Sequence, residues 1–311
     1  MRLFLTGATG VVGRRAVPLL IAQGHRVSGV ARTPEKRARL ERLGADPVSV
    51  DLFNADAVRQ AVAGHDAVIN LATHIPGSPR LFLPGAWTEN DRIRREASTN
   101  LASAAGAGGA ERFIQESFAP VYSDRGDAWI DESTPIQPAP YNRTVMDAER
   151  AAESFSDGRI GIVLRFAGFY GPDAWHVQDM IRYVRKGWAP IPGSPGGFFS
   201  SVSHDDAATA VVAALRIGPG VYNVVDDEPV RRREFFDSLA GVLGVAPPRI
   251  PPAWMAGLAG SVGQTLARSL RISNRKLRIE SGWAPKYPSV REGWRAVVEE
   301  LGPQTPQAGS L

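Results

Sequence analysis

Three glycines near the N-terminus have a spacing that suits the binding of a phosphate group. A short apolar run at residues 2–6 leads into Gly7, Gly10 and Gly13, and a helical pattern follows at residues 14–23. Gly7 permits a tight turn, Gly10 lets backbone N–H groups approach a pyrophosphate, and Gly13 lets the helix lie close to the strand. The helix N-terminus adds unpaired N–H donors and the positive end of its dipole.

An ordinary glycine-rich turn is the alternative interpretation. The preceding strand, the following helix and a second apolar strand at residues 26–31 instead favour a dinucleotide-binding loop, because that motif requires this context. We therefore expect the following residues to bind the cofactor: Gly7, Thr9, Gly10, Val11, Val12 and Gly13.

The elements around this loop alternate between strand and helix through the first half of the chain. Short apolar strands separated by helices indicate a parallel sheet covered on both faces, so we predict an α/β fold with a doubly wound sheet. Such a sheet binds its nucleotide at the carboxyl ends of the strands. The predicted strands cover residues 3–6, 26–31, 47–50, 67–71, 112–115 and 160–165, and the predicted helices cover residues 12–23, 34–43, 55–63, 89–105 and 143–155.

The character of the chain changes after residue 165, where glycine and proline become frequent. We predict a Rossmann domain over residues 1–165, to which residues 204–225 return. A smaller C-terminal substrate lobe then comprises residues 166–203 and 226–302, with helical patterns at 233–243, 254–270 and 290–301. Residues 303–311 form a polar tail that we expect to be disordered.

Composition limits the chemistry that this chain can perform. It has 311 residues and no cysteine, which excludes disulfides, thiolate catalysis and cysteine-based zinc sites. His176 and His204 have no metal-ligand spacing with a nearby acid, so we expect no metal. The net charge is +4 and the arginines are dispersed, without the continuous basic stripe that would indicate a nucleic-acid partner.

The sequence also gives an expectation about the compartment. The apolar stretch at residues 254–270 contains Gln264 and Arg268 and is too short to span a bilayer. The first predicted strand begins so early that it leaves no room for a signal peptide. We therefore expect a cytoplasmic protein with no membrane partner.

Further motifs follow the glycine loop in a fixed order. They occupy residues 50–52, 70–73, 121–122, 140–141, 164–165, 170–172, 205–208, 221–225 and 282–285. With the loop, they resemble the extended short-chain dehydrogenases/reductases, the group of the NAD-dependent epimerases and dehydratases, over about residues 1–301. The resemblance implies that Asp51, with Leu52 beside it, bonds the adenine amino group, and that Leu71, Ala72, Thr73 and Tyr141 border the cofactor.

The end of the second predicted strand distinguishes the two nicotinamide cofactors. NAD-binding proteins carry an acid there for the ribose 2′-hydroxyl, whereas NADP-binding proteins carry a cation. This chain has Arg32 and no acid, and Lys36 follows one helical turn later. A planar guanidinium suits a 2′-phosphate, so we predict NADP as the cofactor, with NAD as the alternative.

The catalytic positions depart from the pattern of the family that the chain resembles. That family uses a Tyr-x-x-x-Lys pair and a Ser or Thr, and the lysine charge lowers the tyrosine pKa. Here Tyr141 is present, but Val145 stands at the lysine position. Phe118 stands at the Ser/Thr position with Ser117 beside it, and Arg94 aligns with an asparagine expected near the nicotinamide.

Three hypotheses follow from this divergence. In the first, the protein is an NADP-dependent oxidoreductase or epimerase-like enzyme acting on a small molecule, with Tyr141 and Ser117 as catalytic residues. His74, Glu116 or Arg94 would then help the tyrosine. In the second, the protein is a cofactor-binding regulatory module. In the third, the same pocket catalyses a non-redox cyclisation or elimination.

The resemblance also has implications for the substrate and for assembly. We expect the small-molecule substrate to lie between the nucleotide domain and the smaller lobe, where the carboxyl ends of the strands open. Members of the family often dimerise through a four-helix bundle. In this chain, a homodimer would use the helices predicted at residues 89–105 and 143–155.

Overall fold

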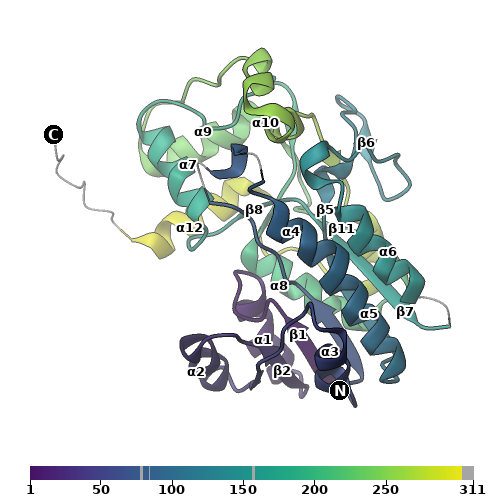
Figure 1. Cartoon of the computed structure of the whole chain (residues 1–311). Coiled ribbons are helices and arrows are strands. Elements are labelled where there is room, and N and C mark those ends of the chain that lie inside the picture. Colours follow the sequence, from purple (N-terminus) through teal and green to yellow (C-terminus); the bar gives the residue numbers. More distant parts are fainter. Residues whose placement is uncertain (78–79, 84, 156–157, 303–311) are drawn as a thin grey trace.

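The computed structural model describes residues 1–77, 80–83, 85–155 and 158–302 (Figure 1). Its centre is a parallel seven-stranded sheet in the order β11-β7-β5-β4-β1-β2-β3, which confirms the predicted doubly wound α/β fold. The strands are β1 Arg2–Thr6, β2 Arg26–Val30, β3 Asp46–Val48, β4 Ala67–Asn70, β5 Arg112–Phe118, β7 Ile160–Phe166 and β11 Gly220–Val224. The tail at residues 303–311 lies outside the described residues.

Alternate residues of the central strands pack against helices on opposite faces of the sheet. On β1, Leu3 and Leu5 belong to the core that α1 and α8 cover, whereas Phe4 belongs to the core beneath α3, α5 and α6. All three side chains are fully buried, as a strand covered on both faces requires. The helices of the first face are α1 Gly13–Ala22, α2 Pro34–Arg42 and α8 His204–Ala213, and those of the second are α3 Ala55–Val62, α5 Ser98–Ala107 and α6 Val145–Phe155.

The helix that approaches the predicted site is interrupted. The sequence predicts one helix over residues 89–105, but the structure has α4 Thr88–Arg92, a π-helical turn η2 Ile93–Ala97, and then α5. Turns of π-helix often occur at functional sites, and this one carries Arg94. The helix predicted at residues 143–155 begins later, because the 3₁₀ turn η4 Pro140–Asn142 precedes α6.

A second layer of helices lies over the carboxyl ends of the strands. Its core contains Trp294, Phe235, Phe236 and Tyr170, all almost fully buried, and Figure 1 shows α7, α9, α10 and α12 together on this side of the sheet. The helices and turns on this side are α7 Trp175–Arg185, α9 Arg232–Leu243, η6 Ala253–Ala259, α10 Gly260–Leu266 and α12 Val290–Leu301. The turn η5 Ala214–Arg216 and the helix α11 Arg275–Ser281 instead contribute Leu215 and Leu277 to the core of the central sheet.

Short strands and turns join the two layers. The helix predicted at residues 254–270 is divided where Gly260 takes a positive φ of 60°, which separates the 3₁₀ turn η6 from α10. The remaining elements are η1 Arg80–Phe82, η3 Ala119–Val121, β6 Trp129–Ile130, β8 Gly168–Tyr170, β9 Phe198–Phe199, β10 Ser201–Ser203, β12 Val230–Arg231 and β13 Arg271–Ile272.

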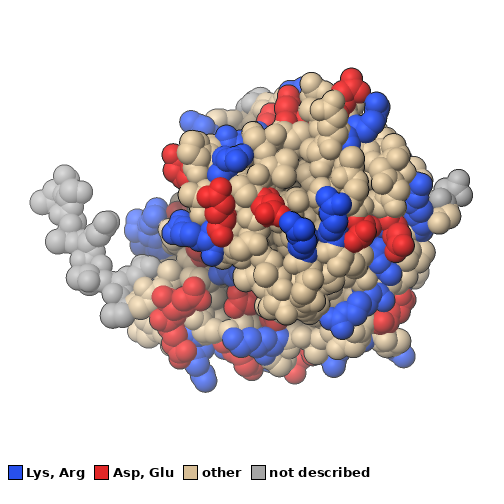
Figure 2. All heavy atoms as spheres, turned by 90° about the horizontal axis from the view of Figure 1, so that it is seen from below, with Lys and Arg blue, Asp and Glu red and all other residues tan. Residues whose placement is uncertain are grey.

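The surface carries charges of both signs. On the face drawn in Figure 2, basic and acidic side chains are interspersed rather than segregated. None of the helices in the described part of the chain combines the length and the apolar character needed to cross a membrane.

Candidate cofactor and active site

The glycine loop has the close backbone packing that its sequence predicts. Gly7 has a φ of 64°, and a Cβ atom there would lie 2.3 Å from the carbonyl oxygen of Leu71. A Cβ atom at Gly13 would lie 2.2 Å from the carbonyl oxygen of Gly7, and the Gly10 N–H donates to that same oxygen at 2.9 Å. Any larger residue at Gly7 would therefore collide with the segment that follows β4, and one at Gly13 would push α1 away from the loop. The loop fits the pyrophosphate of a dinucleotide.

The N-terminus of α1 has no side-chain cap, so a ligand could accept hydrogen bonds from its backbone N–H groups. Its N-cap residue, Val12, provides no side-chain hydrogen bond, so an anion would find the dipole end of the helix available. Arg15 does not compete for that anion, because its Nε donates to Asp205 at 2.6 Å and its Nη1 to Asp173 at 2.9 Å. These bonds attach α1 to α8 and to the segment after β8.

A buried amide fixes the neighbouring strand end. Asn70 Oδ1 accepts a hydrogen bond from Thr6 Oγ1 at 2.5 Å and from the Ala72 N–H at 3.2 Å. Asn70 Nδ2 donates to Gln115 Oε1 at 2.8 Å. Leu71, Ala72 and Thr73 are thereby held where β4 ends beside the glycine loop; Leu71 is buried and Thr73 is exposed.

The residues predicted to bind the adenosine end lie after β2 and β3. Arg32 is exposed, and Thr33 beside it caps α2 by accepting the Lys36 N–H. Asp51 is exposed, and its carboxylate accepts the Phe53 N–H at 3.0 Å, while Leu52 is half-buried. β2 pairs with both β1 and β3, so the two ends carrying Arg32 and Asp51 are adjacent at one edge of the sheet.

Tyr141 lies in the turn η4, beside the smaller lobe. Its ring is 4.9 Å from that of Trp87, and part of its surface remains open to solvent. Burial raises the pKa of Tyr141 to about 12, although the charges of Arg94 and Arg268 and a hydrogen bond with Thr265 act in the opposite direction. At neutral pH the hydroxyl is therefore protonated.

Arg94 is the cation that faces this tyrosine most strongly. Its side chain is only 3% exposed, and within the described residues its Nε and Nη1 have no hydrogen-bond partner. Its charge also acts on Glu116 at the end of β5. Burial raises the pKa of Glu116, the Arg94 charge opposes that effect, and Glu149 adds to it.

Ser117 takes part in a buried network. Its hydroxyl donates to Glu149 Oε1 at 2.5 Å, and the Glu149 carboxylate accepts from Arg165 Nε at 2.8 Å and Nη2 at 2.6 Å. Arg165 Nη1 donates to the Tyr122 hydroxyl, which in turn donates to Asn223 Oδ1, both at 2.9 Å. This network joins β5, α6, β7 and β11. The catalytic role of Ser117 stays a prediction, and it would require the hydroxyl to leave Glu149.

Helix α10 brings residues that the sequence did not indicate. It packs beside η1, η3 and η4, so Thr265 reaches Tyr141. Just beyond the helix, Arg268 Nη1 donates to the carbonyl oxygens of Pro120 at 3.1 Å and Tyr122 at 2.8 Å. These residues are more than a hundred positions from Tyr141 in the chain, and no motif marks them. The third candidate helper, His74, is exposed, and its N–H donates to Asn90.

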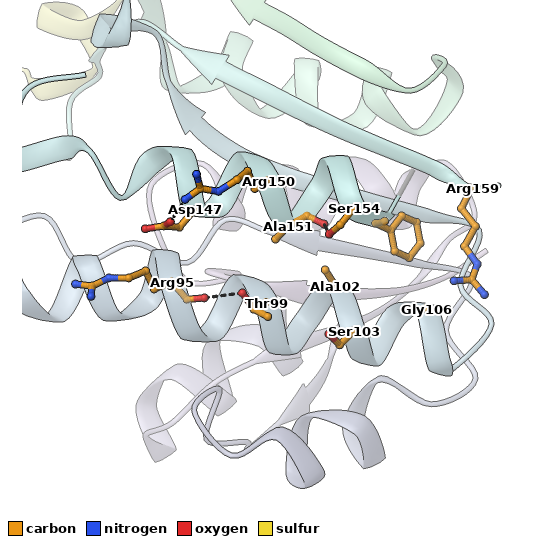
Figure 3. A pocket seen from close by; sticks show the side chains of 11 residues that line it. Arg95, Thr99, Ala102, Ser103, Gly106, Asp147, Arg150, Ala151, Ser154 and Arg159 are labelled. Atoms are coloured by element: carbon orange, nitrogen blue, oxygen red, sulfur yellow. Dashed lines mark hydrogen bonds and ion pairs between the residues drawn. The ribbon is translucent and has the colours of Figure 1, made fainter. Parts of the chain in front are cut away.

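A separate hollow of about 510 Å³ lies on the outer face of α5 and α6. Figure 3 shows Thr99, Ala102 and Ser103 from one helix facing Ala151 and Ser154 from the other. Arginine side chains stand at its ends (Arg95, Arg150 and Arg159). The hollow lies on the helix pair predicted to form a dimer, away from the glycine loop and Tyr141.

This fold and its loop define a nucleotide-binding protein of the α/β class. A family model described as NAD(P)H-binding matches residues 7–157. The 3-diazoavenalumate denitrifying reductase of a Streptomyces species is 33% identical over 308 residues, covering 94% of this chain and 99% of that protein. A 2-alkyl-3-oxoalkanoate reductase of Shewanella oneidensis is 26% identical, covering 88% of this chain and 73% of that protein. The chain belongs to the extended short-chain dehydrogenase/reductase family.

Solved structures agree with this assignment. A human epimerase family protein determined with NADPH has a TM-score of 0.81 at 22% identity, covering 97% of this chain and 100% of that chain. The UDP-glucose 4-epimerase of Thermus thermophilus, determined with NAD, has a TM-score of 0.77 at 26% identity, covering 98% and 100%. Both cofactors therefore occur among proteins of this fold.

Proposed function

We propose that this chain is an NADPH-dependent reductase of a small organic molecule. The observation that carries the proposal is the glycine loop, where the space for a side chain at Gly7 and Gly13 is taken by backbone. When bound, NADPH supplies a hydride. The two reductases among the relatives support reduction over epimerisation.

Arg32 supports NADPH over NADH. It is exposed where β2 ends, and no acid stands there to bond a ribose 2′-hydroxyl. A guanidinium holds a 2′-phosphate by charge-assisted hydrogen bonds, which contribute about 1.5–3 kcal/mol each. Asp51 would bond the adenine, and the glycine-loop N–H groups would hold the pyrophosphate.

Tyr141 would act as a neutral hydrogen-bond donor. Val145, at the position of the family's lysine, is fully buried and apolar, so it provides no charge to ionise the tyrosine. Reduction of a carbonyl group needs a hydride at carbon and a proton at oxygen, and the Tyr141 hydroxyl would polarise that oxygen and donate the proton. The reverse reaction needs a tyrosinate, which is scarce when burial raises the pKa of Tyr141 to about 12.

A second candidate reaction needs no proton donor at all. Hydride addition to an aryl diazonium ion with loss of dinitrogen leaves a carbon–hydrogen bond, and the charges balance without a proton. The name of the Streptomyces relative describes a denitrifying reduction of a diazo compound, which supports such an acceptor. A panel of aryl diazonium ions and ketones would separate the two reactions.

The substrate site and the assembly follow from the same architecture. We propose that the substrate lies near Tyr141, between the strand ends and the lobe of residues 166–203 and 226–302, because α10 of that lobe reaches Tyr141 through Thr265.

We also propose a homodimer in which a second copy packs on α5 and α6. The small side chains that line the hollow in Figure 3 would let helices approach closely.

Calorimetric titration of both cofactors tests the proposed specificity. We expect the wild type to bind NADPH more tightly than NADH, and R32A to lose about tenfold or more of its NADPH affinity without losing NADH affinity. The exposed Arg42 at the end of α2 offers a matched control, since R42A removes the same charge from the same region. Equal affinity of the wild type for the two cofactors would remove the basis for NADPH.

A further inference from the structure

Arg94 presents a buried guanidinium with two N–H donor atoms that lack hydrogen-bond partners in the described residues. Its side chain is 3% exposed, and Nε and Nη1 find no partner within the described residues. Burying N–H donors without hydrogen-bond partners is costly. Arg165, the buried arginine of the Ser117 network, instead has two hydrogen bonds to Glu149 and one to Tyr122. An unpaired arginine at this place therefore indicates a missing anion.

Two buried amide side chains lie near Arg94. Asn90 precedes Arg94 by four residues along the same helical segment, and Asn142 follows Tyr141; both side chains are fully buried. Their oxygens already accept the N–H groups of His74 at 2.9 Å and Ala139 at 2.7 Å, which fixes the orientation of both amides. Asn90 Nδ2 is left over without a partner in the described part of the chain, whereas the Asn142 side chain faces the Tyr141 hydroxyl.

A side-chain bond ties these two segments together. Thr144 Oγ1 donates to Asp91 Oδ1 at 2.7 Å, which joins α4 to the connection between η4 and α6. The unpaired groups of Arg94 and Asn90 are donors only, because Asn90 Oδ1 already accepts the His74 N–H. Glu116 does not supply the acceptor, because neither Nε nor Nη1 of Arg94 bonds to it. A ligand oxygen with negative charge would complement this set.

Aromatic and apolar side chains lie on and beside the segments that carry these donors. Trp87 and Tyr141 are in ring contact, Val145 is buried one turn later, and Phe118 is half-buried where β5 ends. We propose that Arg94 binds a carboxylate of the substrate, which makes the substrate a small aromatic acid; this rests on the reductase function proposed above. Arg94 is then the residue that selects the substrate by charge.

A pair of probes of equal shape tests this inference on the complex with NADP⁺. Cinnamate carries the carboxylate, and cinnamamide is its neutral counterpart. We expect calorimetry to show cinnamate binding about tenfold or more tightly than cinnamamide to the wild type, which corresponds to about 1.4 kcal/mol or more. R94Q should abolish the difference and R94K should retain part of it. R95Q is the matched control, because Arg95 is the exposed neighbour.

Stability and cofactor binding provide two independent checks. We expect R94Q to stay folded and to bind NADP⁺ as the wild type does, since Nε and Nη1 of Arg94 make no hydrogen bond that the substitution would remove. The inference is overturned if the wild type fails to prefer cinnamate, if R94Q keeps the preference, or if R94Q loses its fold or its NADP⁺ affinity. An inactive enzyme that still prefers cinnamate would contradict only the proposed reductase function.

Discussion

Substitution of Val145 by lysine would restore the family's Tyr-x-x-x-Lys pair, in which the lysine charge lowers the pKa of the tyrosine. In the native protein, burial raises the pKa of Tyr141 to about 12. That is about two units above the ordinary value, or about 2.7 kcal/mol in favour of the protonated form. At pH 7 only about one molecule in 10⁵ would carry a tyrosinate.

The expected size of the change follows from the same numbers. An opposite charge within about 4–6 Å lowers a pKa by about 1–3 units. In V145K we therefore expect the pKa of Tyr141 to fall from about 12 toward about 10, still too high for a general base at neutral pH. Weak alcohol dehydrogenation should become measurable only above about pH 9.

Tyrosinate absorbance as a function of pH measures this directly. The titration step that disappears from the absorbance curve in Y141F belongs to Tyr141. Y183F removes an exposed tyrosine and serves as the control, because it should leave that step in place. V145M controls for the size of the side chain, because Val145 is fully buried. A step near pH 7 in the wild type that is absent from Y141F would refute this reasoning, since another residue would then replace the lysine.

The loop, the pH dependence of stability and the assembly provide three further predictions. G13A should lose most of its NADPH affinity in calorimetry, because a Cβ atom there would lie 2.2 Å from the Gly7 carbonyl oxygen; G241A, where nothing lies within 4 Å of the added atom, should bind normally. Burial lowers the pKa of His204 to about 3, so the folded protein resists a proton that the unfolded chain binds near pH 6.5. The neutral His204 side chain contributes in full to the free energy of unfolding above about pH 6.5, and this contribution falls by about 2 kcal/mol by pH 5. In urea titrations, the free energy of unfolding of H204Q should therefore decline less over this pH range than that of the wild type. An equal decline in the two proteins would exclude His204 as the cause. A102R should convert a dimer into a monomer in light scattering, and a monomeric wild type would contradict the proposed assembly.

Local signals made much of the fold predictable from the sequence. Residues 290–301 were predicted as a helix and form one, because Ser289 and Glu292 make a capping box at its start. The close packing at Gly7 and Gly13 likewise follows from the spacing of the glycines. In each case, the determining residues lie within a few positions of one another.

Non-local contacts account for what the sequence did not indicate. β5 was predicted to end at residue 115 but continues to Phe118, because residues 116–118 pair with the end of β7 and the polar Ser117 finds Glu149 on a distant helix. The approach of Thr265 to Tyr141 depends on how the lobe folds over the sheet. Whether Arg94 has hydrogen-bond partners likewise depends on which side chains folding brings around it. No spacing of residues in the sequence indicates this.

Transfer of a labelled hydride tests the proposed function most directly. The protein would be incubated with NADPH carrying deuterium at the transferable position, together with a panel of small ketones and aryl diazonium carboxylates. We expect mass spectrometry to find one deuterium in the product for each NADPH oxidised, with G13A inactive because its loop cannot close. Tight NADPH binding without oxidation by any member of the panel would contradict a reductase and favour the regulatory module.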